Sequence, residues 1–358
     1  MANPARIAWR LPPVWVRRCI IAPLVVLLAF VWLPIAIWVG VVVAGIVSLA
    51  FPGKLRLFRV FFMMGLYLLW DAFALVVMFV LWVISGFGLA IRKPFFVRAH
   101  YRLARMMLGS LFVAARWVLR LKVNIQLEDV EGVTTGHPMI LVSRHAGPAD
   151  SFIIVHALLS RFGREPAIVL KDTLQWDPAV DVLLNRVPSR FVTPTRQRKQ
   201  GAPGGAAAIG ELARGLDEDD ALLIFPEGAN ATPRRRERRI AQLRDQGHAE
   251  LADRAEAMGH VMPPHAGGVL AAMDARPDAV VVMVAHTGLE RLLTVGDVWR
   301  ELPVDKQITL NGWLTDPAEI PEGVREREAW LYDWWEKIDA WIDANQPQAK
   351  SAETDSPE

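Results

Sequence analysis

The chain divides into an apolar N-terminal part and a longer remainder in which short apolar runs alternate with polar, helix-like stretches. Residues 19–52 carry no charged side chain, and between residues 60 and 89 the only charge is Asp71. About 20 apolar residues are enough to cross a bilayer. The pattern therefore predicts two membrane-embedded segments within residues 19–90.

Basic flanks limit how these two segments sit in a membrane. Arginines and lysines cluster within residues 6–18, 54–59 and 92–105, before, between and after the segments. The positive-inside rule places such clusters in the cytoplasm. Two spans satisfy the first and last clusters and are favoured here, whereas two re-entrant hairpins, which Pro23 and Pro34 would permit, satisfy all three.

Downstream of residue 121, the periodicity alternates between strand-like and helix-like. Short apolar runs predict strands at residues 122–127, 139–142, 167–170, 190–192, 221–225, 280–285 and 308–314. Helices are predicted at residues 149–160, 178–184, 204–214, 233–258, 267–274 and 324–344. Alternation of strands with helices is typical of an α/β domain, so we expect a mixed, largely parallel sheet flanked by helices.

Six regions follow from this pattern. They are a basic cytoplasmic N-terminus (1–18), membrane-embedded helices (19–90), an amphipathic interfacial helix (91–121), the α/β domain (122–316), a Trp-rich helix (317–346) and a disordered tail (347–358). In the Trp-rich helix, Trp330, Trp334 and Trp341 share one face at helical spacing, so we expect them to pack on the α/β domain.

The candidate chemistry begins with His145 and Asp150, directly after the predicted strand at 139–142. Residues five apart do not stack on a straight helix. Gly147 and Pro148 supply a bend, and Pro148 also suits the first turn of a helix. We therefore predict that Asp150 folds back onto His145. In such a pair the histidine takes a proton from a hydroxyl and the carboxylate stabilises the imidazolium that forms.

A second block, Phe225-Pro226-Glu227-Gly228, directly follows the strand predicted at 221–225. Because α/β active sites form beyond the carboxyl ends of the strands, we expect both blocks to meet at one edge of the sheet. No serine or cysteine stands where a nucleophile elbow requires one, so His145 is interpreted as activating the hydroxyl of a second substrate directly.

Together these residues resemble the HxxxxD-type glycerolipid acyltransferases, typified by 1-acylglycerol-3-phosphate (lysophosphatidic acid) acyltransferase. The resemblance covers roughly residues 123–313. It implies that His145 and Asp150 are catalytic. It also implies that Lys171, Arg190, Pro226, Glu227 and Gly228 bind the substrate, with Arg196 and Arg198 as alternatives to Arg190.

Several positions depart from the family pattern, and they bear mainly on the identity of the acceptor. Residues 229–232 read Ala-Asn-Ala-Thr where the family usually has Thr-Arg-Ser, so an arginine near the acceptor is absent or displaced to Arg234. The fourth block, at residues 281–284, lacks its usual proline. The polar stretch at 233–258 is similar to an insertion seen in the lysocardiolipin and lysophosphatidic acid branch.

The resemblance implies a fatty acyl transfer from acyl-CoA or acyl carrier protein to a lysophospholipid, with 1-acylglycerol 3-phosphate as the favoured acceptor and phosphatidic acid as the product. Another lysolipid acceptor, a lipid hydrolase and a non-catalytic lipid-binding protein remain alternatives. No metal ion and no cofactor are expected, because no second histidine stands at ligand spacing. Membrane lipids are expected partners and nucleic acid is not, because no nucleic-acid-binding motif is present.

Charge and cysteine content add little beyond location. The formal net charge is +2, and the single cysteine, Cys19, excludes a disulfide framework. Five arginines between residues 234 and 239 form the densest basic run, either a phosphate-binding platform or a solvated helix face. We expect an integral protein of the cell membrane whose catalytic domain faces the cytoplasm, where acyl donors are found.

Overall fold

The computed structural model describes residues 11–50, 55–126, 136–192, 204–228, 232–288, 307–315 and 317–346. Each of the seven predicted strands is present, and together they form one sheet in the order β1-β7-β6-β2-β5-β3-β4. The strands are β1 (Lys122–Gln126), β2 (Met139–Ser143), β3 (Glu165–Lys171), β4 (Ser189–Val192), β5 (Asp220–Ile224), β6 (Val280–Thr287) and β7 (Gln307–Thr315).

The sheet is mixed and largely parallel, as predicted. Only β6 and β7 pair antiparallel among these strands. Strands β2 and β5 are neighbours at its centre, with Val142 in register with Ile224. β2 also pairs with β6 on its other side. The chain segments that follow β2 and β5 therefore leave the sheet at the same edge and side by side.

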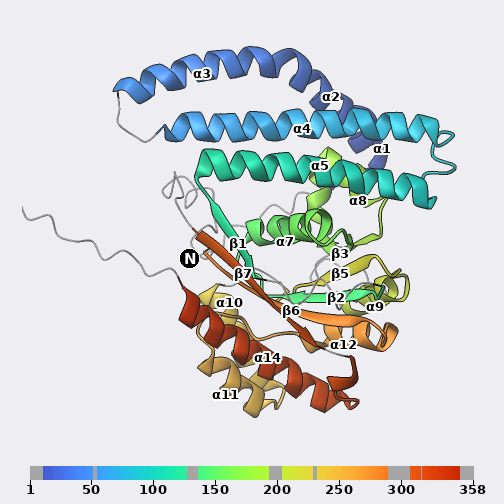
Figure 1. Ribbon diagram of the computed structural model, residues 1–358, viewed down its shortest axis with the longest axis vertical. Helices are drawn as coiled ribbons and strands as arrows, with labels where there is room; N and C mark the ends of the chain where they lie inside the picture. Colours follow the sequence, from blue (N-terminus) through green and yellow to red (C-terminus); the bar gives the residue numbers. More distant parts are fainter. Residues whose placement is uncertain are drawn as a thin grey trace, which may run out of the picture.

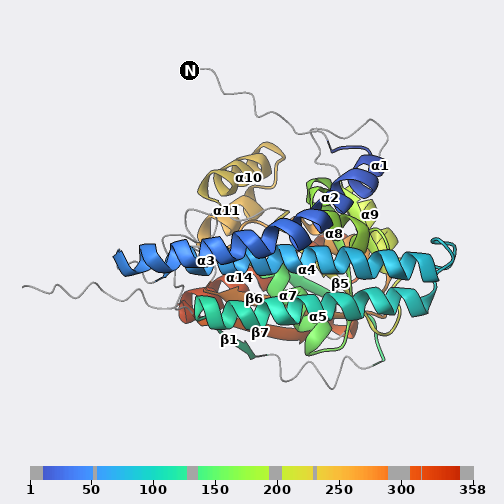
Figure 2. The ribbon, with the colours of Figure 1, turned by 90° about the horizontal axis from the view of Figure 1, so that it is seen from above.

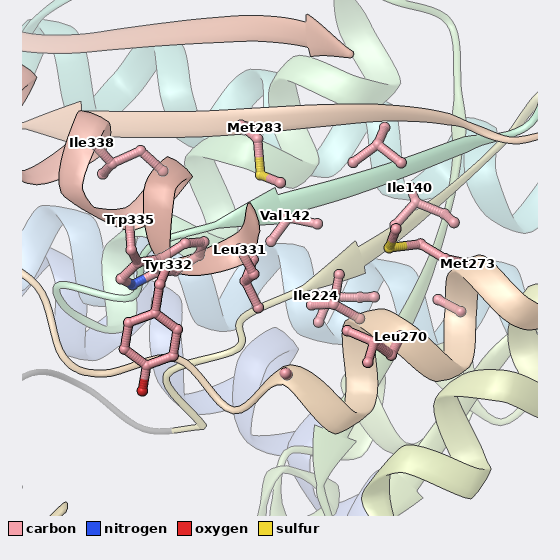
Figure 3. Packing of buried hydrophobic residues seen from close by; sticks show 14 of the residues in the cluster. Ile140, Val142, Ile224, Leu270, Met273, Met283, Leu331, Tyr332, Trp335 and Ile338 are labelled. Atoms are coloured by element: carbon pink, nitrogen blue, oxygen red, sulfur yellow. The ribbon is translucent and has the colours of Figure 1, made fainter. Parts of the chain in front are cut away.

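One face of the sheet is covered by the C-terminal helices (Figure 1). These are α9 (Gly205–Arg214), α10 (Pro233–Asp245), α11 (Ala249–Ala257), α12 (Ala266–Ala275) and α14 (Val324–Asn345). Val142 and Ile224 from the sheet share a buried core with Tyr332 and Trp335 of α14 (Figure 3). Trp330, Trp334 and Trp341 pack against the same core, which confirms that this helix docks on the α/β domain.

The prediction of one long helix at 233–258 is wrong in one respect, because the structure has two helices there, α10 and α11. The break falls at Gly247, whose φ is +83°. A left-handed residue cannot continue a right-handed helix, and glycine adopts that conformation without a steric penalty. The two short helices fold against each other and bury Ile240 and Leu243 of α10 and Ala252 and Ala255 of α11.

The opposite face carries α7 (Pro148–Ser160) and, beyond it, α5 (Pro94–Leu119), with α8 (Pro178–Leu184) beside them (Figure 1). α5 corresponds to the predicted amphipathic helix. Leu103 and Ala104 are buried on its inner side, whereas Arg98, Arg102, Arg105 and Arg116 are exposed. α4 (Arg56–Ile84) lies against α5, and α3 (Leu33–Ala50) lies against α4 (Figures 1 and 2).

The first helix is uninterrupted along the chain but changes its winding twice. π-Helical turns at Arg17–Ile21 and Leu28–Trp32 separate α1 (Val14–Val16), α2 (Ala22–Leu27) and α3. Each turn directly precedes the start of a helix that has a proline, Pro23 or Pro34, at its second position. A proline ring clashes with the carbonyl four residues earlier and donates no hydrogen bond, and a wider turn relieves that clash.

The first helix and α4 are attached to the α/β domain by polar contacts. Arg17 is buried and donates to both carboxylate oxygens of Asp181 on α8, at 3.3 and 3.0 Å. Tyr67 of α4 donates to Asp177, and Asp71 accepts from the backbone N–H of Ala179 at 3.3 Å. Asp71 is thus a capping ligand for the N-terminus of α8.

Candidate active site

His145 and Asp150 are brought together where β2 ends and α7 begins. Gly147 precedes α7 in an extended conformation, Pro148 opens the helix, and Asp150 is its third residue. Nδ1 of His145 lies 3.1 Å from each carboxylate oxygen of Asp150. The predicted contact across the bend is confirmed, and it is local: a glycine, a proline and one helical turn produce it.

The carboxylate of Asp150 is held by several donors. Besides His145, it accepts from the backbone N–H of Gly147 at 3.0 Å and from that of Ser151 at 2.6 Å. Burial by itself raises the pKa of Asp150, but its contacts with His145 and His286 outweigh burial and hold the pKa well below its usual range. Asp150 is therefore ionised at neutral pH, and it fixes the proton of His145 on Nδ1.

The other ring nitrogen of His145 is available for chemistry. Within the described part of the chain no hydrogen bond engages its Nε2, and the side chain is 16% exposed. The ring packs against Phe225 of the second block, with centroids 4.6 Å apart and the ring planes tilted by 31°. The two blocks thus meet at one edge of the sheet, as predicted. A hydroxyl that approaches from solvent can donate its proton to Nε2.

Glu227 lies behind this pair rather than at the surface. It is 2% exposed, and neither carboxylate oxygen has a hydrogen-bond partner among the described residues. Burial raises its pKa to about 8, although the Arg144 guanidinium and the backbone N–H groups of His145 and Met262 act in the opposite direction. Those N–H groups lie near the carboxylate without meeting hydrogen-bond geometry. A substrate would not touch Glu227 without movement of the groups that cover it.

Pro226 and Gly228 shape the turn that follows β5. The buried Pro226 offers its carbonyl to the backbone N–H of His265 at 2.8 Å. Gly228 has φ +69° and donates its N–H to the carbonyl of Phe225 at 3.0 Å. This left-handed position favours glycine. Gly228 is exposed, so its backbone is the part of the second block that a ligand can reach.

Lys171 and Arg190 occupy different places relative to the pair. Lys171 is the exposed last residue of β3, the strand next to β5, and so lies at the same edge of the sheet. Arg190 lies one strand further out, on β4, and forms an ion pair with Glu211 of α9 at 3.7 Å. It is in register with Val169, which packs on the α9 side.

The structure therefore does not bring Arg190 to the His145–Asp150 pair. The alternatives Arg196 and Arg198 lie outside the described residues, as do residues 229–231. Arg234, at the start of α10, is exposed.

Two residues at the site were not singled out from the sequence. Arg144 is 2% exposed and donates to the carbonyls of His286 at 2.9 Å and His260 at 3.3 Å. His286 is 1% exposed at the end of β6, and its Nε2 lies 3.6 Å from Oδ2 of Asp150. The available signal was a histidine that interrupts an apolar run in the strand beside β2.

Part of the chain is similar to a known protein family. The family model described as Acyltransferase matches residues 124–287, a range that contains His145, Asp150 and the block from Phe225 to Gly228. This part of the chain is therefore similar to an acyltransferase domain. No curated protein sequence matches the chain.

Among solved structures, the chain is similar to the 1-acyl-sn-glycerophosphate (LPA) acyltransferase PlsC from Thermotoga maritima. Sequence identity is 16%, the TM-score is 0.47, and the match covers 80% of this chain and 97% of that chain. So distant a similarity says nothing about the substrate of the present chain.

Proposed function

We propose that this protein is a glycerolipid O-acyltransferase that moves a fatty acyl group from a thioester donor to a free hydroxyl of a lysophospholipid. The observation that supports it most directly is the 3.1 Å contact between Nδ1 of His145 and a buried, ionised Asp150, with Nε2 left open to solvent. This arrangement occurs inside the segment that matches the acyltransferase family.

In the proposed reaction, Nε2 of His145 removes the proton of the acceptor hydroxyl as its oxygen attacks the thioester carbonyl. The tetrahedral intermediate collapses, the carbon–sulfur bond breaks, and the thiolate takes the proton back from the imidazolium. Asp150 stabilises that imidazolium through Nδ1 without being protonated itself. The products are an ester and a free thiol, so atoms and charges balance without any further reactant.

Direct transfer fits the residues around the pair better than a covalent acyl-enzyme. The hydroxyl of Ser143 is fully buried and donates to the carbonyl of Arg144 at 3.0 Å. The hydroxyl of Ser151 lies 3.3 Å from Oδ1 of Asp150, the far side of the pair from Nε2. Among the described residues neither serine is placed to be activated by His145, so the acceptor hydroxyl itself is the proposed nucleophile.

The acceptor is proposed to be a lysophospholipid whose phosphate lies near Lys171 and the exposed backbone of Gly228, with 1-acylglycerol 3-phosphate favoured. Both residues lie at the carboxyl edge of the sheet beside the pair. Pro226 and Glu227 are buried and would support the turn that carries Gly228. Arg190 would take part only if its ion pair with Glu211 opened. The donor, acyl-CoA or acyl carrier protein, places the reaction on the cytoplasmic side.

Membrane attachment is proposed through α1 to α4. Two segments, Val14–Val31 and Arg56–Ile84, are long and apolar enough to cross a membrane. Large apolar side chains such as Trp38 and Phe79 are exposed on α3 and α4. A cavity of about 390 Å³ between these helices is lined by apolar residues, among them Val39 and Phe61. The cavity is lined by α3 and α4, and α5 lies between α4 and the sheet (Figure 1), so acyl chains of the bilayer rather than the reacting acceptor are its proposed occupants.

The test is an acyl-transfer assay with the purified full-length protein and a labelled acyl-CoA or acyl carrier protein. Labelled phosphatidic acid should form only when lysophosphatidic acid is added, and a panel of other lysolipids then defines the acceptor by mass spectrometry. Equal release of free fatty acid with and without acceptor would instead identify a hydrolase that uses water at Nε2. If no donor is turned over, the result would indicate a non-catalytic lipid-binding protein.

His145→Ala is the decisive variant. It should lower turnover by about 10² to 10⁴, the usual contribution of general-base catalysis. His248→Ala is the matched control, because His248 is an exposed histidine at the start of α11 and should leave turnover unchanged. The protein's thermal midpoint should be the same in both variants, so that loss of activity reports on chemistry rather than folding.

A further inference from the structure

A second histidine stands behind the Asp150 carboxylate. His286 is the seventh residue of β6, the strand that pairs with β2, and it is 1% exposed. Its Nε2 lies 3.6 Å from Oδ2 of Asp150, whose two oxygens also contact Nδ1 of His145. Asp150 therefore lies between two imidazoles, one that reaches solvent and one that is enclosed.

His286 is not explained by packing alone. Neither of its ring nitrogens has a hydrogen-bond partner among the described residues, and burying such groups without a partner is unfavourable. The preceding residues of β6, Val280 to Ala285, are all apolar and buried. A leucine would suit this position better if the strand only had to fill the core. The retained imidazole therefore points to a polar task directed at Asp150.

At 3.6 Å, Nε2 of His286 is close to Oδ2 of Asp150 but too far away for a hydrogen bond. Hydrogen bonds within catalytic groups are often long in the unliganded enzyme and shorten in the substrate complex. A movement of about half an ångström would bring Nε2 within normal hydrogen-bond distance of Oδ2.

We propose that His286 is a positioning residue that donates its Nε2–H to Asp150. This hydrogen bond weakens the electrostatic stabilisation that the carboxylate gives to the protonated form of His145. The inference rests on the proposed acyl transfer. A buried carboxylate that is shared with one imidazole alone would favour the imidazolium, which cannot accept a proton from the acceptor. A second donor on Oδ2 makes Asp150 a weaker acceptor and keeps His145 neutral at a lower pH.

Other charged groups lie near His145, Asp150 and His286. Arg144 donates to the backbone carbonyl of His286 at 2.9 Å, and both the Arg144 guanidinium and the backbone N–H of His145 lower the pKa of Glu227. Neither residue changes in the variants described below, so a difference between those variants reports on the imidazole at position 286.

The experiment compares His286→Leu with His286→Gln in the acyl-transfer assay across pH. Part of the free energy of this hydrogen bond to a charged group, corresponding to about half to one pH unit, should be passed through Asp150 to His145. The acidic limb of kcat/KM should move to higher pH by that amount in the leucine variant, so activity below the limb falls about three- to tenfold. The glutamine variant, whose amide N–H can replace Nε2–H, should return towards wild type. The thermal midpoint of the leucine variant should not fall.

Two results would overturn the proposal. One is that the wild type is active and the acidic limb of kcat/KM lies at the same pH in His286→Leu as in the wild type. The other is nitrogen NMR of wild-type protein with ring-labelled histidine that finds the His286 proton on Nδ1 instead of Nε2, a measurement that needs no variant to fold. If the wild type transfers no acyl group at all, the proposed function fails, and the NMR result alone still decides whether His286 donates to Asp150.

Discussion

The two buried carboxylates of the site are driven in opposite directions by their surroundings. Asp150 is surrounded by donors that keep it charged, whereas burial raises the pKa of Glu227 to about 8. Pairs of titratable groups whose environments separate their pKa values usually have different roles. In the proposed mechanism Asp150 carries the charge that stabilises the imidazolium of His145, whereas Glu227 is a mostly neutral carboxyl at neutral pH.

The raised pKa of Glu227 makes stability depend on pH with a definite sign. The folded state keeps this proton up to about pH 8, whereas an unfolded glutamate loses it near 4.5. Between those values the folded state binds more protons, so its contribution to stability is full below about pH 4.5 and is lost as pH rises towards 8. We expect the thermal midpoint of the wild type to fall over that interval relative to Glu227→Gln.

The readout is the difference in midpoint between the two proteins, measured at several pH values from 4.5 to 8.5 in the same detergent. Other buried acids titrate identically in both and cancel. A difference that stays constant with pH would mean that Glu227 is ionised in the folded protein, so that Arg144 and the neighbouring N–H groups outweigh burial.

The His145–Asp150 pair was predictable from sequence because a few adjacent residues make it. Gly147 and Pro148 impose the bend and a single helical turn returns the carboxylate. Arg190 shows the limit of such reasoning, because its direction depends on the register of β4 and on Glu211 of α9, neither of which is local. The enclosure of Glu227 and the approach of His286 likewise depend on β6 and on the loop at Met262, far away in sequence.

Among the elements, strands were easier to predict than helix boundaries. A strand buried on both faces of a parallel sheet reads as an uninterrupted apolar run, and β2, β5 and β6 are buried along their whole length. The polar stretch at 233–258 contains good helix formers on both sides of Gly247, so its periodicity predicted a single helix. In the folded protein the same stretch forms two helices, α10 and α11. The π-helical turns of the first helix were not foreseen either.

One buried arginine of the first helix forms an ion pair with α8. Arg17 and its neighbour Arg18 both contact Asp181, but the side chain of Arg17 is 5% exposed and that of Arg18 is 39% exposed. Removing one partner of a buried pair leaves an uncompensated charge and costs about 3–5 kcal/mol, whereas an exposed pair contributes about 0–1 kcal/mol. We expect Arg17→Met to detach this helix from α8 and Arg18→Met to leave it in place.

Limited proteolysis in detergent, with thermal unfolding alongside, distinguishes the two variants. Cleavage near residues 11–16 should accelerate in Arg17→Met alone, and Asp181→Asn should have a similar effect because it removes the shared partner. Equal behaviour of the two arginine variants would show that the contact with Asp181 does not hold the helix.

At the scale of the whole molecule, the helices form successive layers over one face of the sheet. From the sheet outwards these are α7, α5, α4 and α3 (Figure 1). α4 and α5 lie side by side and are joined by a short turn, so they run in opposite directions (Figure 2). This arrangement bears on the two spans favoured from the sequence, because α4 is one of them.

A transmembrane orientation of α4 conflicts with its neighbours. Its middle is fixed to the α/β domain by Tyr67 and Asp71, which contact Asp177 and Ala179. The exposed arginines of α5 extend from Arg98 to Arg116, about 27 Å along the helix, nearly the thickness of the hydrocarbon core. If α4 crossed the bilayer, these charges would cross with it, at high cost. We therefore expect α4 to lie along the membrane surface, with α3 on its lipid side.

Cysteine labelling tests this orientation, because Cys19 is the chain's single cysteine and can be replaced by serine. In that background, Arg56→Cys and Lys93→Cys place one thiol near each end of α4. If α4 lies in the surface, a membrane-impermeant maleimide should label both thiols from the cytoplasmic side and neither from the opposite side. A span would place the two thiols on opposite sides, and labelling of only one from each side would restore the two-span interpretation. A cysteine at exposed His248, directly before α11, reports the side of the α/β domain in the same vesicles.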